Sequence, residues 1–132
     1  DYFDKSDREL FLLIDSDKHT GNHLKQAERA QQFEANKDMG SAYVINKSCI
    51  ENYYHPRAFE RTYGLTANSF PELSAEDNVR AVIKQYKASH APQANIKEKN
   101  NFDVFGQMTR QEWEQVVEQE LIDFLARILD LP

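Results

Sequence analysis

The sequence has little cysteine, no long apolar run and a shortage of positive charge. Cys49 is the single cysteine among 132 residues, so an internal disulfide is excluded and a reducing compartment, by default the cytoplasm, is expected. The longest apolar run is the segment Leu10–Ile14, far short of the roughly 20 residues that cross a bilayer. No basic and then apolar secretory leader opens the sequence. We therefore expect no membrane partner.

The charge balance limits how the chain could meet nucleic acid. The 22 acidic and 16 basic side chains give a formal net charge of −6, which argues against a protein that coats nucleic acid through bulk positive charge. Residues 1–66 hold 11 acidic and 9 basic side chains, whereas residues 67–132 hold 11 and 7. An enzyme that holds a short stretch of phosphate backbone through metal ions and a few lysines remains compatible with this balance.

The apolar run is followed at once by two aspartates, Asp15 and Asp17. A continuous apolar run bounded by polar residues is typical of a strand buried on both faces of a parallel sheet. Ligands bind outside the carboxyl ends of such strands, and paired carboxylates there suit Mg²⁺ or Mn²⁺. The alternative is a strand that simply turns into a helix, because Asp and Ser are also good caps and turn formers.

A parallel crossover is predicted next. Residues 23–36 have the composition of an exposed helix, and residues 42–45 read as a second strand, so the fold class is α/β. If the two strands are neighbours, Lys47 and Glu51 reach the same sheet edge as the aspartates. We expect Lys47 to contact a phosphate oxygen and Glu51 to join the carboxylates. The alternatives are a solvated loop lysine and a first-turn glutamate that interacts with a helix dipole.

These residues carry a family resemblance. The Asp15-Ser16-Asp17 segment and the later Ile50-Glu51-Asn52-Tyr53 stretch, within about residues 8–62, resemble the Toprim domain of the OLD (overcoming lysogenisation defect) family nucleases and related prokaryotic defence nucleases. The resemblance implies a partial Toprim-like parallel sheet in which Asp15, Asp17 and Glu51 are metal ligands and catalytic residues. It also implies a Mg²⁺- or Mn²⁺-dependent endonuclease in anti-phage defence, acting on DNA, with RNA left open.

The resemblance further implies partners and an incomplete site. An ATPase domain or subunit is the expected protein partner, and a homo-oligomer stays open. Toprim enzymes also use a glutamate from an earlier strand. Only 14 residues precede Asp15, too few for that strand and its helix, so we expect this chain to be the back part of such a domain.

The second half is predicted to be helical. We expect an α/β segment over residues 1–66 and a helical segment over 67–132 packed on it. Helices are predicted over residues 55–63, from a cap at Ser74, and without interruption from a Thr109 capping box to residue 128, with an irregular stretch over 88–105. The resemblance implies a later lysine at the active site, taken as Lys97, with Lys84 and Lys99 as further candidates. Solvated surface lysines are the alternative.

Two other functions fit the same residues. One is a fragment of a DxD glycosyltransferase or phosphotransferase, in which the aspartate pair holds a metal-bound nucleotide diphosphate. The other is a catalytically inactive interaction module, which should bind no Mn²⁺.

Overall fold

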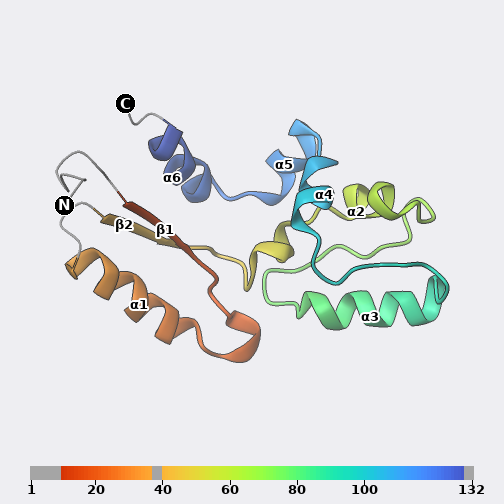
Figure 1. Cartoon of the computed structure of the whole chain (residues 1–132), viewed down its shortest axis with the longest axis horizontal. Helices are drawn as coiled ribbons and strands as arrows, with labels where there is room; N and C mark the ends of the chain where they lie inside the picture. The colour runs from red at the N-terminus through yellow and green to blue at the C-terminus, as the bar shows by residue number, and fades with distance from the viewer. Residues whose placement is uncertain (1–9, 37–39, 130–132) are drawn as a thin grey trace, which may run out of the picture.

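The predicted α/β class is confirmed by the structure, a computed structural model that describes residues 10–36 and 40–129 (Figure 1). Strands β1 (Leu10–Ile14) and β2 (Gly40–Val44) form a two-stranded parallel sheet. The register runs from the Leu10 and Gly40 pair to the Ile14 and Val44 pair. Helix α1 (His23–Asn36) makes the crossover between the strands, as the sequence predicted.

The other regular elements of the described chain are helices. They are the short 3₁₀ helices η2 (Lys18–Thr20) and η3 (Ile50–Tyr53), and then α2 (Pro56–Tyr63), α3 (Val79–His90), α4 (Asn101–Gly106), α5 (Arg110–Val116) and α6 (Gln119–Leu129). Helix α2 ends at Gly64, whose φ of 64° suits glycine at this position. Among the described residues, no helix is both long enough and apolar enough to span a membrane.

Helices cover the sheet from two sides, α1 from one and α6 from the other (Figure 1). Ile14 of β1 and Ala30 of α1 are buried. The Phe124 ring of α6 has its centroid 5.6 Å from that of Phe11 and 5.4 Å from that of Tyr43, which lie on β1 and β2. The last helix of the chain therefore returns to the sheet near the start of the chain.

A second core lies among the helices. The rings of Phe59 and Phe70 stack with centroids 4.1 Å apart, and Tyr86 meets Phe70 edge-on. The buried residues of this core are Tyr54, Phe59, Phe70, Val79, Ile83, Tyr86, Ile96 and Val104. Burial of such side chains stabilises the fold by roughly 25 cal/mol per Å² of apolar surface.

Two predicted boundaries in the helical segment are wrong. Helix α3 begins at Val79, and its cap is Asn78, which accepts a hydrogen bond from the Ala81 N–H. Ser74 instead belongs to a turn in which its N–H donates to Asp77. The stretch 88–105 was predicted to be irregular, yet α3 runs to His90 and α4 occupies residues 101–106.

The helix predicted from residue 109 to 128 is broken in the middle. Its capping box is confirmed, because Thr109 and Glu112 hydrogen-bond each other reciprocally at the start of α5. Val117, however, is extended, with φ −98° and ψ 127°. The next residue, Glu118, accepts hydrogen bonds at 2.6 Å from the Tyr53 hydroxyl and at 3.0 Å from the Tyr43 hydroxyl. These tertiary bonds favour the break over a continuous helix.

We expect Glu118→Ala to lower the free energy of unfolding by about 2 kcal/mol, because the substitution leaves two tyrosine hydroxyls without their acceptor. The measurement is urea unfolding followed by circular dichroism. The matched control is Glu120→Ala at the exposed first turn of α6. Equal midpoints for the two variants would contradict the role given to Glu118.

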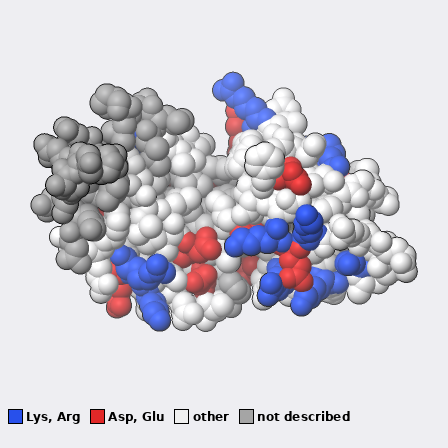
Figure 2. All heavy atoms as spheres, in the orientation of Figure 1, with Lys and Arg blue, Asp and Glu red and all other residues white. Residues whose placement is uncertain are grey.

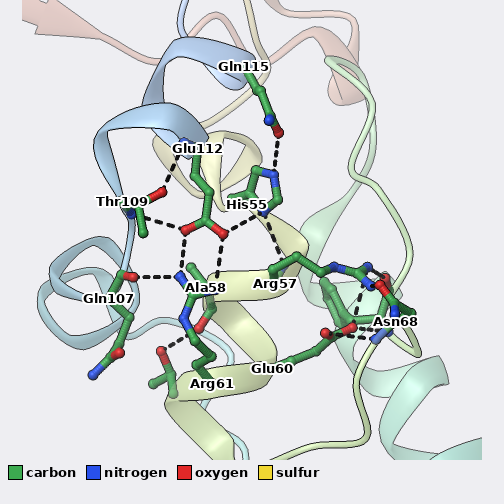
Figure 3. Close-up of polar contacts among 12 residues, drawn as sticks. His55, Arg57, Ala58, Glu60, Arg61, Asn68, Gln107, Thr109, Glu112 and Gln115 are labelled. Carbon is green, nitrogen blue, oxygen red and sulfur yellow. Dashed lines mark hydrogen bonds and ion pairs between the residues drawn. The ribbon is translucent and has the colours of Figure 1, made fainter.

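A network around Glu112 joins α2 to α5 (Figure 3). The carboxylate accepts hydrogen bonds from the Arg61 guanidinium and, at 3.0 Å, from the Thr109 N–H. Its Oε2 lies 3.5 Å from Nδ1 of His55, whose Nε2 is 2.6 Å from Gln115 Oε1. The buried carboxylate thus links two helices through residues that are 51 positions apart in the sequence.

Candidate metal centre

The loops after β1 and β2 are joined at the carboxyl edge of the sheet. The buried Ser16 hydroxyl donates to the Lys47 carbonyl at 2.7 Å, and the Asp17 N–H donates to the Ser48 carbonyl at 2.8 Å. This is the juxtaposition that a parallel crossover predicts. It places the residues that follow the two strands side by side.

Asp17 is held in a left-handed conformation, with φ 53° and ψ 35°. Aspartate tolerates this region better than most residues. Its carbonyl accepts the N–H groups of Thr20 and Asn22, and its Oδ2 accepts the Gln26 side-chain amide at 2.7 Å. Gln26 is buried and in turn accepts from Arg29 at 2.9 Å. A chain of side chains on α1 therefore orients this carboxylate.

Asp15 is exposed, and its Oδ1 accepts the Ile50 N–H at the start of η3 at 3.2 Å. That contact brings Cys49 to the aspartates. Asp15, Asp17 and Cys49 each offer one ligand atom, and these atoms all lie within 4.8 Å of one another. Burial, and then the neighbouring charges of Asp15 and Glu51, raise the pKa of the Cys49 thiol. The thiol is therefore protonated at neutral pH.

Glu51 lies beside this group but is not part of it. Its carboxylate faces a cleft that Cys49, Arg80 and Lys99 also line. Its Oε1 is 3.8 Å from Lys99 Nζ, and its Oε2 is buried without a hydrogen-bond partner among the described residues. The side chain is only 14% exposed. Cys49, and not Glu51, therefore joins the two aspartates in the group of ligand atoms that lie within 4.8 Å of one another.

The lysines predicted for the site differ in their contacts. The Lys47 ammonium is 4.6 Å from the centroid of the Tyr53 ring. Burial lowers the pKa of Lys47, and the charge of Glu118 opposes that shift. Lys97 is exposed, and its carbonyl accepts the Tyr63 hydroxyl. Of the lysine candidates, Lys99 is the one that contacts Glu51.

Three residues of the site region were not predicted for these roles: Gln26, Cys49 and Asn52. Asn52 is buried and bonds in three directions, accepting the Cys49 N–H and donating to the carbonyls of Ser74 and Asp77, each at 2.9 Å. Its role in the Ile-Glu-Asn-Tyr stretch is to anchor η3. The sequence did contain a signal for the burial of Gln26, because this residue shares a helix face with Ala30, one turn further along α1.

We expect Cys49 in the folded chain to react slowly with iodoacetamide near neutral pH, because only the thiolate is alkylated and the pKa of this thiol is raised. Asp15→Asn should speed the reaction severalfold, since it removes a negative charge beside the sulfur. Mass spectrometry of timed samples gives the rates. Asp123→Asn on α6 is the matched control, and an equal rate in both variants would contradict the closeness of Asp15 to Cys49.

Comparison of the chain with protein family profiles, with curated proteins and with solved structures found no match. The Toprim resemblance therefore stays a prediction, and function has to be inferred from the site itself.

Proposed function

We propose that this chain carries the metal site of a divalent-metal-dependent nuclease, with Asp15 and Asp17 as the ligands. The observation that supports the proposal is the convergence of the ligand atoms of Asp15, Asp17 and Cys49 within 4.8 Å at the carboxyl edge of a parallel sheet. This edge is where open α/β sheets bind their ligands.

The donor atoms fit Mg²⁺ or Mn²⁺. Two carboxylates supply the hard oxygen ligands that both ions prefer, and each carboxylate is oriented by an N–H donor, from Ile50 or from Gln26. The Cys49 sulfur would become a third ligand only as a thiolate, so binding through it would require loss of the thiol proton. A bound ion would lower the pKa of a water molecule and offset the charge of the phosphate.

The protein side chains supply the other parts of phosphodiester hydrolysis. The reaction forms a bond from a water oxygen to phosphorus and breaks the bond from phosphorus to a sugar oxygen, which then takes up a proton. The Oε2 of Glu51, which has no hydrogen-bond partner within residues 10–36 and 40–129, is the group suited to accept the proton of the water. Lys99, 3.8 Å from the other oxygen of Glu51, is placed to balance charge on the phosphate.

The resemblance adds further proposals: DNA as the substrate, an ATPase domain or subunit as the partner, and a role in anti-phage defence. An N-terminal segment that supplies one more glutamate belongs to the same set. None of these rests on the geometry of the described residues, whereas metal binding by the aspartates does.

The test combines calorimetric titration of the chain with Mn²⁺ and a plasmid-nicking assay in Mn²⁺, Mg²⁺ or EDTA. We expect saturable Mn²⁺ binding. Because the resemblance implies one further glutamate from an earlier strand, nicking by this chain alone should be slow, and EDTA should abolish it. If no Mn²⁺ binds, the chain is an interaction module. Mn²⁺ binding that creates a site for nucleoside diphosphates, without nicking, would assign the chain to the transferases.

A further inference from the structure

Positive charge is concentrated in one part of this acidic protein. Residues 79–99 hold five basic side chains and one acidic side chain, whereas the remainder of the chain holds 11 basic and 21 acidic ones. Helix α3 contributes no acidic residue at all. Figure 2 shows Lys and Arg side chains gathered on the side where α3 lies, next to acidic side chains near the middle of the face.

The basic residues of α3 form a stripe. Arg80, Lys84 and Lys87 follow each other at steps of four and three residues, which puts them on one helix face. Arg80 is 72% exposed and Lys84 is 68% exposed. The buried side of the same helix carries Val79, Ile83 and Tyr86, so the stripe stands on an element anchored in the helical core.

The stripe leads to the metal centre. Arg80 lines the same cleft as Cys49, Glu51 and Lys99, and Cys49 belongs to the aspartate group. A second hollow, which Lys84 and Lys87 line, follows along α3. The two hollows share Glu98 in their walls. A polyanion lying along the stripe would therefore end at Asp15 and Asp17.

Glu98 is the residue that such a polyanion would displace. Its carboxylate is 2.5 Å from the Arg80 guanidinium and 3.7 Å from the Lys84 ammonium. It is the one acidic side chain in the basic region. Solvent reaches both ion pairs, because Arg80 and Lys84 are exposed and Glu98 is 30% exposed, so an incoming phosphate can replace the carboxylate at little cost.

We propose that the α3 stripe, formed by Arg80, Lys84 and Lys87, binds the phosphate backbone of a nucleic acid strand and leads it past Lys99 to the aspartates. The seven steps from Arg80 to Lys87 rise by about 10 Å, which is close to the axial rise of roughly three nucleotides of a duplex strand at about 3.4 Å each. Cleavage of the bound strand rests on the proposed function. Binding along α3 does not.

The experiment measures fluorescence anisotropy of labelled single-stranded and duplex oligonucleotides of mixed sequence, with the whole chain in EDTA at several salt concentrations. We expect the triple variant Arg80→Gln, Lys84→Gln and Lys87→Gln to bind about tenfold more weakly at low salt. Its salt slope should fall by about 2 to 3, because three phosphate contacts are lost. The matched control replaces three exposed basic residues elsewhere: Lys25, Arg110 and Arg127.

Glu98→Gln should change the affinity for the oligonucleotide in the opposite direction. We expect it to tighten binding severalfold, because it removes the carboxylate that competes for Arg80 and Lys84. Circular dichroism checks that each variant is folded. Equal affinities of the triple variant and its control would overturn the proposal. So would polyglutamate that competes as well as unlabelled oligonucleotide, since the stripe would then be a site for acidic peptides.

Failure of the metal site and failure of the stripe give different results. Because EDTA is present, Asp15→Asn should bind the oligonucleotide at least as tightly as the parent chain. If binding depends on the stripe but no Mn²⁺ binds, the proposed nucleic-acid surface is supported and the proposed nuclease function is rejected. Mn²⁺ uptake with no effect of the triple variant would do the reverse.

Discussion

Asp15→Asn and Asp17→Asn are each expected to reduce Mn²⁺-dependent nicking by about 100-fold or more, while the chain stays folded. Each substitution removes a negative ligand, but it keeps the shape of the side chain and an oxygen that can accept from Ile50 or Gln26. Altering groups that merely support a metal ligand typically costs 10–100-fold, so loss of a ligand itself should cost more. Calorimetric titration with Mn²⁺ and plasmid nicking, run on the same preparations, measure the two effects.

The matched control is Asp123→Asn, at an exposed aspartate on α6 whose Oδ1 accepts a hydrogen bond from the Gln119 side-chain amide. It should bind Mn²⁺ as the parent chain does. Parental nicking in either site variant would rule out the assigned ligands. Loss of nicking with unchanged Mn²⁺ binding would mean that other residues bind the metal ion.

Glu112→Ala is expected to lower the free energy of unfolding by about 2 kcal/mol or more at pH 7. The carboxylate is 11% exposed, and its removal leaves the Arg61 guanidinium and the Thr109 N–H without their shared acceptor. The capping box of α5 loses only its Glu112 half, because the Thr109 hydroxyl still accepts the N–H of residue 112. Because Arg61 is 42% exposed, solvent screens part of the ion pair and limits the effect.

The same substitution should change how stability depends on pH. The hydrogen bond from Arg61 is the main reason that the pKa of Glu112 falls from 4.5 to about 2. A carboxyl whose pKa is lowered on folding stabilises the fold above its unfolded pKa, and that stabilisation is lost as the pH falls from 4.5 towards 2. Urea unfolding across this range should therefore show a shallower loss for Glu112→Ala than for the parent chain.

Glu114→Ala is the control for both measurements. Glu114 lies one turn from Arg110 on the same helix and is 62% exposed, so its ion pair should add little. If Glu112→Ala and Glu114→Ala unfold alike at pH 7 and in acid, the network of Figure 3 does not join α2 to α5 energetically.

Part of the candidate site could be predicted from the sequence. The apolar run before Asp15 predicted β1, and the crossover predicted that the loop after β2 would meet the aspartates, as the bond from the Asp17 N–H to the Ser48 carbonyl now shows. The sequence could not predict that Cys49, and not Glu51, would be the third potential ligand beside the aspartates. Because the Ile50 N–H bonds to Asp15, η3 starts at the aspartates, which brings Cys49 to them and leaves Glu51 in the cleft beside Lys99.

The choice between lysines also depended on tertiary contacts. Lys97 and Lys99 are two residues apart in one polar stretch, and nothing in their local sequence separates them. The Lys97 carbonyl is held by the Tyr63 hydroxyl, while the Lys99 side chain reaches Glu51. Contacts between residues that are more than 30 positions apart in the sequence decide which of the two lysines reaches Glu51.

By itself, the sequence determined the elements whose signals are local: the apolar run of β1, the stop of α2 at Gly64, and the capping box of Thr109 and Glu112. Periodicity, backbone freedom and capping act within a few residues, so they can be read directly from the order of side chains. The tertiary structure alone decided the break before α6, where Glu118 meets Tyr43 and Tyr53, because the energy of hydrogen bonds between distant segments exceeds the weak local preference for one continuous helix.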